Sequence, residues 1–325
     1  MTIMDALRKV KPALASSDVV IEFKHFLIKD GFIYAQDGRI TAAAPIDFTV
    51  DKEFLIPANE FEKSVALFEG VGKDINVKVT DKTLLLSTDA HKARIKILDP
   101  STFKIIEFEG DAGYAVKDDF LRALRICRPF ISDNATQLWA AGIYIDGARM
   151  YATNNVSLIS ADISDFNFKG MLPIWTVDFI LSRKEKLTHI SGTENALKVE
   201  WEDGSWLRST LIAAQFPGAG LAMLDSLTAA SFTIQPAWKR AYQECIIFSD
   251  EQIHLYADKM LAVKDTMEFE TSEGSPVGEN IEFTNWNPKF LTPVVSVATA
   301  IDFDQYPKPA IFSGPGFRGL ISGRR

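Results

Sequence analysis

Apolar and polar residues alternate with two different periods along this chain, and the two periods follow each other in a fixed order. The segment 118–132, DDFLRALRICRPFIS, places apolar residues on one side of a helix and Arg122, Arg125 and Arg128 on the other. The segment 19–45 instead alternates residue by residue and is broken by two Asp-Gly pairs, which is typical of antiparallel strands joined by tight turns. The segments 138–163 and 251–272 read in the same way.

Two landmarks recur three times in the chain. A Ser-Asp pair follows each predicted first helix, and its aspartates are Asp18, Asp133 and Asp250, which are 115 and 117 residues apart. A proline then introduces each predicted second helix, as Pro57, Pro173 and Pro288, which are 116 and 115 residues apart. Chance similarity among ordinary α+β segments is the alternative, but two landmarks that keep their spacing through three copies favour an internal repeat.

Each copy is predicted to contain a helix, strands, a second helix and more strands, so the fold class is α+β. Two helices would cover one face of an antiparallel sheet in each of three domains, 1–111, 112–228 and 229–325. Units arranged in line can share a continuous sheet, and closure with a second copy would leave no sheet edge open.

Composition limits the class of protein. The 325 residues exceed one typical small domain, the formal net charge is −8, and 47% of residues are hydrophobic. No apolar run is long enough to span a membrane, and the charged N-terminal segment lacks the apolar core of a secretory signal, so we expect a cytoplasmic protein. Cys127 and Cys245 lie in helical apolar patterns and are expected to be buried thiols.

The sequence shows no catalytic or metal-binding motif. The four histidines, His25, His91, His189 and His254, stand singly and lack partners at metal-ligand spacing. The glycine-rich segment 313–319 lacks the Lys-Ser/Thr of a phosphate-binding loop, and Asp118-Asp119 is placed for helix capping. We therefore expect no enzyme activity, no metal and no cofactor.

At this point the chain resembles the bacterial DNA polymerase III beta sliding clamp. FLIPANEFEKSVALFEGV (54–71) is similar to the second helix of that family's first domain, and LWAAGIYIDGARMYATNNVSLISADI (138–163) to the central strands of its second domain. TLIAAQFPGAG (210–220) and GFRGLISGRR (316–325) resemble the end of the second domain and the chain's end. The chain is short for the family and its third copy is trimmed, which fits a divergent or virus-encoded member.

The resemblance implies a head-to-tail homodimer that closes into a six-domain ring around double-stranded DNA. Such a ring is a processivity factor that a clamp loader places on DNA and that tethers a DNA polymerase. Helices would line the hole and hold DNA through phosphate contacts, which carry no sequence information and weaken with salt. The candidate DNA-binding residues are Arg8, Lys9, Lys11, Lys63, Arg122, Arg125, Arg128, Arg183, Lys184, Lys186, Lys239, Arg240 and Lys289. Ordinary solvated helix faces are the alternative for these positions.

The resemblance also implies a pocket for short hydrophobic peptides of partner proteins, between the second and third domains. The matching positions are Thr153, Asn155, Leu158, Pro217, Leu221, Leu320 and Ile321. Asn154-Asn155 stands where the family usually has Asp-Gly, and the chain's end also departs from the family pattern, so the pocket is expected to differ in shape. Leu158 and Ile321 could instead be plain core residues.

Two other classes of protein stay open. One is a scaffold or ring that is built from clamp-like repeats but does not bind DNA. The other is an enzyme whose site residues are too dispersed to recognise in the sequence. Retention on closed circular DNA would separate a clamp from both.

Overall fold

The computed structural model describes residues 2–15, 20–48, 50–69, 75–106, 108, 110, 113–164, 168–228, 230, 232–272 and 283–324. The repeat landmark Asp18 lies outside the described residues. Residue contacts divide the chain into two compact units, Met1–Val116 with Asp178–Leu211, and Lys117–Val177 with Ile212–Arg325. Each unit is described by itself below.

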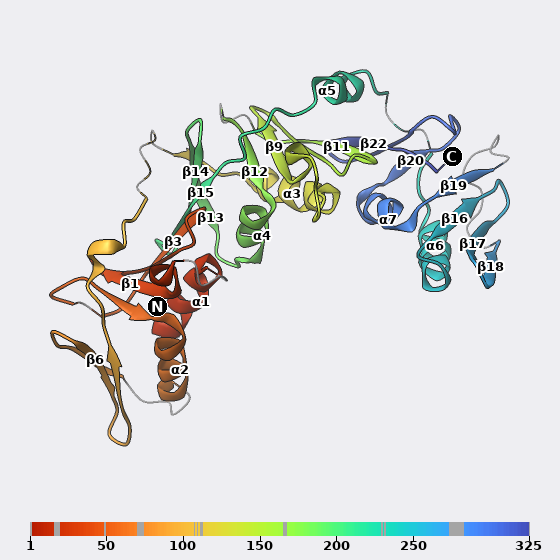
Figure 1. Cartoon of the computed structure of the whole chain (residues 1–325). Coiled ribbons are helices and arrows are strands. Elements are labelled where there is room, and N and C mark those ends of the chain that lie inside the picture. The colour runs from red at the N-terminus through yellow and green to blue at the C-terminus, as the bar shows by residue number, and fades with distance from the viewer. Residues whose placement is uncertain are drawn as a thin grey trace. The chain divides into compact units, whose positions relative to one another are not determined.

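The first unit contains an eight-stranded antiparallel sheet and a three-stranded sheet (Figure 1). The large sheet has the strand order β4 (Phe54–Pro57), β1 (His25–Lys29), β2 (Phe32–Gln36), β3 (Ile40–Pro45), β15 (Trp206–Thr210), β14 (Ala196–Trp201), β13 (Leu187–Gly192), β8 (Tyr114–Ala115). The small sheet has the order β5 (Asn76–Val79), β6 (Thr83–Ser87), β7 (Lys92–Lys96). Helices α1 (Ile3–Val10) and α2 (Ala58–Glu69) pack on each other, and α1 also packs on β2 and β3.

The second unit contains a seven-stranded and a four-stranded antiparallel sheet. The first has the order β12 (Lys169–Pro173), β9 (Gly142–Asp146), β10 (Arg149–Thr153), β11 (Ser157–Asp162), β22 (Phe317–Ile321), β21 (Ala310–Gly314), β20 (Ala300–Asp302). The second has the order β18 (Met267–Thr271), β17 (Met260–Lys264), β16 (Gln252–Leu255), β19 (Thr284–Trp286). Its helices are α3 (Asp118–Cys127), α5 (Gly218–Asp225), α6 (Pro236–Phe248) and α7 (Pro288–Val297), while α4 (Ile174–Ser182) contributes to both units.

The amphipathic pattern of the first helix of each copy decides which face is buried. In α1 the buried residues are Ile3, Met4, Ala6, Leu7 and Val10. Thr2 caps this helix, because its hydroxyl accepts a hydrogen bond from the backbone N–H of Asp5 at 3.1 Å.

Proline ends two of these helices. Pro12 and Pro129 cannot donate a backbone hydrogen bond, so each helix is followed by a 3₁₀ turn, η1 (Lys11–Ala13) or η4 (Arg128–Phe130). The helix predicted over 118–132 is therefore α-helical only to Cys127. The other 3₁₀ turns are η2 (Ile21–Lys24), η3 (Pro100–Thr102) and η5 (Leu138–Ala140).

The repeat is visible in the way the sheets are joined. Strand β3 of the first copy pairs antiparallel with β15 of the second, and β11 of the second copy pairs antiparallel with β22 of the third. The α+β class with repeated helix-and-strand units is thus confirmed. Because sheets run across the copies, residue contacts yield two units instead of three, and the domain bounds 1–111, 112–228 and 229–325 stay a prediction.

In the part of the chain that the structure describes, no helix is long and apolar enough to cross a membrane. The same residues contain no cluster of three or more histidine, cysteine, aspartate or glutamate side chains placed to hold a metal ion.

Candidate functional site

A cleft of about 270 Å³ opens on the seven-stranded sheet of the second unit. Most of it is formed by three segments that are distant in sequence: the turn between β10 and β11, the chain from Phe216 into α5, and the end of β22; Trp139 of η5 and Pro309 before β21 complete it. Its lining comprises Trp139, Thr153, Asn155, Val156, Ser157, Leu158, Phe216, Pro217, Gly220, Met223, Pro309, Leu320 and Ser322. Among these described lining residues none is charged, so the cleft suits apolar side chains that a few polar groups orient.

An aromatic cluster fixes the floor behind this cleft. The Tyr144 and Phe216 rings stack with centroids 5.4 Å apart, and Tyr151 lies 5.9 Å from Phe216. Leu158 and Leu221 pack against the same cluster, which is buried together with Met171 and Leu224. Burial of aromatic surface at this point holds the α5 segment on the sheet.

The Asn154-Asn155 turn has a defined structure without glycine. Asn155 has a φ of 69°, in the left-handed region that asparagine tolerates better than most residues. The Asn154 side-chain oxygen accepts hydrogen bonds from the backbone N–H groups of Val156 at 3.1 Å and Ser157 at 2.7 Å. The Thr153 hydroxyl donates to the Ser157 carbonyl at 2.8 Å. The departure from Asp-Gly therefore leaves a rigid rim of the cleft.

Trp139 forms a further part of this rim. Its indole N–H donates to the Asn155 side-chain oxygen at 3.3 Å, and the Asn155 amide donates to the Gln137 side-chain oxygen at 2.8 Å. The lining residues that sequence reasoning missed are Trp139, Val156, Ser157, Phe216, Gly220, Met223, Pro309 and Ser322. Trp139 and Phe216 stand in segments that carried the family resemblance, so they could have been found there, whereas Pro309 gave no signal.

The predicted pocket residues largely come together. Thr153, Asn155, Leu158, Pro217 and Leu320 all line the cleft. Leu221 instead packs on the aromatic cluster behind it, and Ile321 is buried in β22.

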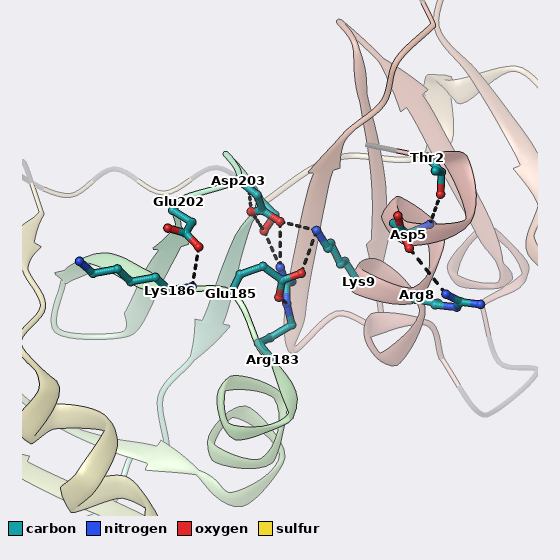
Figure 2. A network of polar contacts seen from close by, with 10 residues as sticks. Thr2, Asp5, Arg8, Lys9, Arg183, Glu185, Lys186, Glu202 and Asp203 are labelled. Atoms are coloured by element: carbon teal, nitrogen blue, oxygen red, sulfur yellow. Dashed lines mark hydrogen bonds and ion pairs between the residues drawn. The ribbon is translucent and has the colours of Figure 1, made fainter.

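A second site, which is polar, lies in the first unit, where α1 meets the segment before β13 and the turn between β14 and β15 (Figure 2). The Lys9 ammonium lies 2.9 Å from a Glu185 oxygen and 2.5 Å from an Asp203 oxygen. Arg183 completes the network, because its Nε lies 2.8 Å from Glu185 and its Nη2 lies 3.4 Å from Asp203. The four charges sum to zero, and the network joins a helix of the first copy to a hairpin of the second.

Burial and ion pairing act in opposite directions on these groups. Burial favours the neutral carboxyl, but hydrogen bonds from Arg183 and Lys9 lower the pKa of Glu185 to about 2. The pKa of Asp203 is also lowered, because hydrogen bonds from Lys9 and Ser205 outweigh its burial. Burial alone would lower the pKa of Lys9, yet its bonds to the two carboxylates raise it. All three groups are therefore charged near neutral pH.

In this network two of the predicted DNA-binding residues, Lys9 and Arg183, form ion pairs within the protein. The side chains of Lys9 and Arg183 are only 13% and 8% exposed, and both are paired with carboxylates. Helix α4 also ends at Ser182, so Arg183, Lys184 and Lys186 lie in the segment before β13 and not on a helix as predicted.

Several of the other predicted basic residues make internal contacts: Lys11 with Glu62 at 2.8 Å, Arg122 with the Pro315 carbonyl at 3.3 Å, Arg128 with Asp133 at 3.5 Å, and Lys239 with the Ala298 carbonyl at 3.0 Å. Lys11 and Arg122 are exposed in spite of these contacts, and so are Arg8, Lys63, Arg125, Lys184, Lys186, Arg240 and Lys289. Of the last set, Arg8 lies 3.6 Å from Asp5 on the same helix.

Comparison with known proteins gives a clear answer for the fold. No protein-family model and no curated protein sequence matches the chain. A Helicobacter pylori beta clamp, solved with a bound DNA ligase peptide, has a TM-score of 0.82 and 17% identity over 99% of this chain and 97% of that chain. The beta subunit of DNA polymerase from Streptococcus pyogenes has a TM-score of 0.84 and 14% identity over 99% and 97%. The Caulobacter crescentus pol III beta has a TM-score of 0.83 and 15% identity over 100% and 98%.

These similarities define the class of fold as that of a DNA sliding clamp with repeated domains. More particularly, the chain has the fold of the bacterial DNA polymerase III beta subunit over nearly its whole length, at 14–17% sequence identity. The resemblance recognised in the sequence is confirmed at this level.

Proposed function

We propose that this protein is a DNA sliding clamp, a homodimeric ring of six domains that encircles duplex DNA and tethers a replicative DNA polymerase. The observation that carries this proposal is the correspondence with bacterial beta clamps along the entire chain, at TM-scores of 0.80 to 0.84. In this reading the protein is a binding ring and not an enzyme, it acts in the cytoplasm, and a clamp loader places it on DNA.

The exposed basic residues supply the DNA contacts in this proposal. Arg8 on α1, Lys63 on α2, Arg125 on α3, Arg240 on α6 and Lys289 on α7 are exposed cations on helices of all three copies. Cations held on helices can attract phosphates without reading bases, which suits a ring that must slide. The 43 acidic residues outnumber the 35 lysines and arginines, and the resulting net charge of −8 disfavours binding of nucleic acid to the rest of the surface.

The cleft beside α5 supplies the partner site. Its uncharged lining and aromatic floor favour a short peptide with apolar anchor residues, carried by the polymerase and the clamp loader. The Helicobacter pylori beta clamp with its DNA ligase peptide is a fold relative that binds a peptide, which supports this part of the proposal.

Retention on DNA of different topology tests the proposal. The protein is assembled on a nicked circular duplex, non-specific binding is removed with salt, and half of the sample is then cut once with a restriction enzyme. A clamp stays on the intact circle and leaves the cut one through its free ends, whereas proteins bound at the ends of the cut DNA should block its loss. Equal retention on both forms, or no retention on either, would contradict the proposal and favour the scaffold that does not bind DNA.

A further inference from the structure

The three-stranded sheet of the first unit, with β6 in its centre, has one buried side and one side that faces solvent (Figure 1). Helix α2 packs on β6 and β7, and Leu84, Leu86 and Ile95 are buried. The side chains that alternate with these three along the strands lie on the solvent side. Four exposed cations define a basic sheet face there: Lys78 on β5, and Lys92, Arg94 and Lys96 on β7.

The strand register arranges these cations around one central residue. Leu85 of β6 is half-buried, and it lies opposite Lys78 on one side and Arg94 on the other. Lys92 and Lys96 lie two residues before and after Arg94, which is about 6–7 Å along β7 in each direction. The uncharged polar residues of the same face are Asn76, Thr83 and Ser87.

The basic sheet face lacks neutralising carboxylates among the residues that the structure describes. None of its four cations forms an ion pair with a described aspartate or glutamate, and Asp81, in the turn before β6, pairs with Lys52 at 3.1 Å. Neighbouring cations lie within about one Debye length of each other and therefore repel. The face is thus positive in a chain whose net charge is −8, and an anionic partner would relieve the repulsion.

The residue types on this face match the phosphate backbone of DNA. Lysine, arginine, asparagine, serine and threonine are the side chains that commonly contact DNA phosphates. None of the described residues of the face is aromatic, so the face offers no platform on which unpaired bases could stack. The face is also flat, and it presents no helix that could enter a groove and read base edges.

Charge density favours duplex DNA over an acidic polypeptide. The three cations of β7 span about 13 Å along the strand. A duplex carries one negative charge per about 1.7 Å of its axis, which gives about eight charges over that length. An extended acidic peptide presents one carboxylate per about 6–7 Å on each side, which gives about two.

We propose that the basic sheet face is a second DNA-binding surface, which holds the phosphates of duplex DNA without reading its sequence. This surface lies on the side of the small sheet that faces away from α2, and it is separate from the helix cations to which the proposed function assigns DNA binding. The inference goes beyond the proposed function, because binding at this face does not require a ring around DNA.

Substitutions of Leu85 test the face and leave its four cations and both outer strands unchanged. Leu85→Glu places a carboxylate between Lys78 and Arg94, where it pairs with them across the strands and removes about two phosphate contacts. It should weaken DNA binding about tenfold and make the slope of log affinity against log salt shallower by about 1.8. Leu85→Gln has the same shape without the charge and should bind DNA as wild type does, whereas Leu85→Lys should steepen the slope by about 0.9.

The DNA for this measurement is a labelled duplex closed by a hairpin loop at each end, because it has no free end onto which a ring could thread. Binding is followed by fluorescence anisotropy without a clamp loader, at about 50 mM salt, where phosphate contacts are strong. Circular dichroism confirms that the variants are folded. Equal affinity of the Glu, Gln and Lys variants of Leu85, or no binding by the wild-type protein, would overturn the inference.

Two other occupants of the face are distinguished in the same experiments. A labelled polyglutamate peptide that binds more tightly than the DNA, and is lost in Leu85→Glu, would assign the face to an acidic polypeptide and overturn the DNA assignment. A molar mass by light scattering that differs between Leu85→Glu and Leu85→Gln would assign it to a contact between copies, which would overturn it as well.

The clamp proposal stands or falls separately from this one. Retention on a nicked circular duplex should be the same for Leu85→Glu and wild type, because the basic sheet face is not among the cations proposed to hold encircled DNA. Failure of the hairpin-closed duplex to bind therefore leaves the clamp proposal standing. Loss of wild-type retention on the circle, with binding to the closed duplex intact, would contradict the clamp proposal and support the sheet face.

Discussion

Replacing Lys9 with methionine should destabilise the first unit through the loss of one charge. Methionine keeps a side chain of similar length and apolar character, so the change removes the ammonium and leaves the packing of the stem nearly intact. The ammonium lies 2.9 Å from Glu185 and 2.5 Å from Asp203, and those carboxylates are only 25% and 15% exposed. Without Lys9, the guanidinium of Arg183 is the cation of this network that pairs with both carboxylates.

The size of the effect follows from this geometry. Removing one partner of a fully buried pair costs about 3–5 kcal/mol, because it leaves an uncompensated charge. The exposure of the carboxylates and the remaining contacts of Arg183 reduce that cost, and we expect about 2–3 kcal/mol for Lys9→Met. For a unit of this size, that corresponds to a fall in the midpoint of thermal unfolding of roughly 5–10 °C.

Arg8→Met is the matched control on the same helix. The Arg8 side chain is 72% exposed and lies 3.6 Å from Asp5, so its loss should change stability by no more than about 0.5 kcal/mol. Thermal unfolding followed by circular dichroism measures both variants, and a double-mutant cycle with Asp203→Asn isolates the coupling. Equal stability of Lys9→Met and Arg8→Met would refute the structural role given to Lys9.

Three further predictions concern pH, the cleft and DNA. The pKa of Glu185 in the folded protein is about 2, below its ordinary value of 4.5, so its contribution to stability should be present above pH 4.5 and be lost as the pH falls towards 2. The difference in unfolding free energy between wild type and Glu185→Gln, measured by denaturant titration, should therefore shrink over that range. A difference that stays constant would contradict this assignment. Leu158→Asp puts a charge into the apolar cleft and should weaken binding of an apolar partner peptide, measured by fluorescence anisotropy, at least tenfold, which corresponds to about 1.4 kcal/mol. Leu138→Asp changes an exposed residue outside the lining and should leave this binding unchanged. Arg125→Ala should make the slope of log affinity for duplex DNA against log salt shallower by about 0.9 without loss of stability, and an unchanged slope would remove Arg125 from the DNA contacts.

The features that the sequence predicted depend on local patterns or on the repeat. Helix periodicity, Asp-Gly turns and the spacing of Pro57, Pro173 and Pro288 act over a few residues or recur at one interval, so they can be read without a structure. Each of these prolines lies at the first residue of a helix or immediately before it. Several pocket residues were also predicted, because the family resemblance marked the segments that carry them.

The features that were missed depend on contacts between distant segments. Lys9 was placed with the DNA contacts, since its helical position gives no sign of Asp203, which lies 194 residues away. Trp139 belongs to the rim of the cleft only because Asn155 turns towards it in the folded chain. The extent of α4 was overestimated, because a run of charged residues can follow a helix as easily as extend it.

Retention on closed circular DNA depends on two copies of this chain forming one closed particle. The molar mass of the wild-type protein in solution, measured by light scattering at micromolar concentration, tests that claim most directly. The account predicts a single species of twice 36.2 kDa. A species of 36.2 kDa, or of three times that mass, would contradict it.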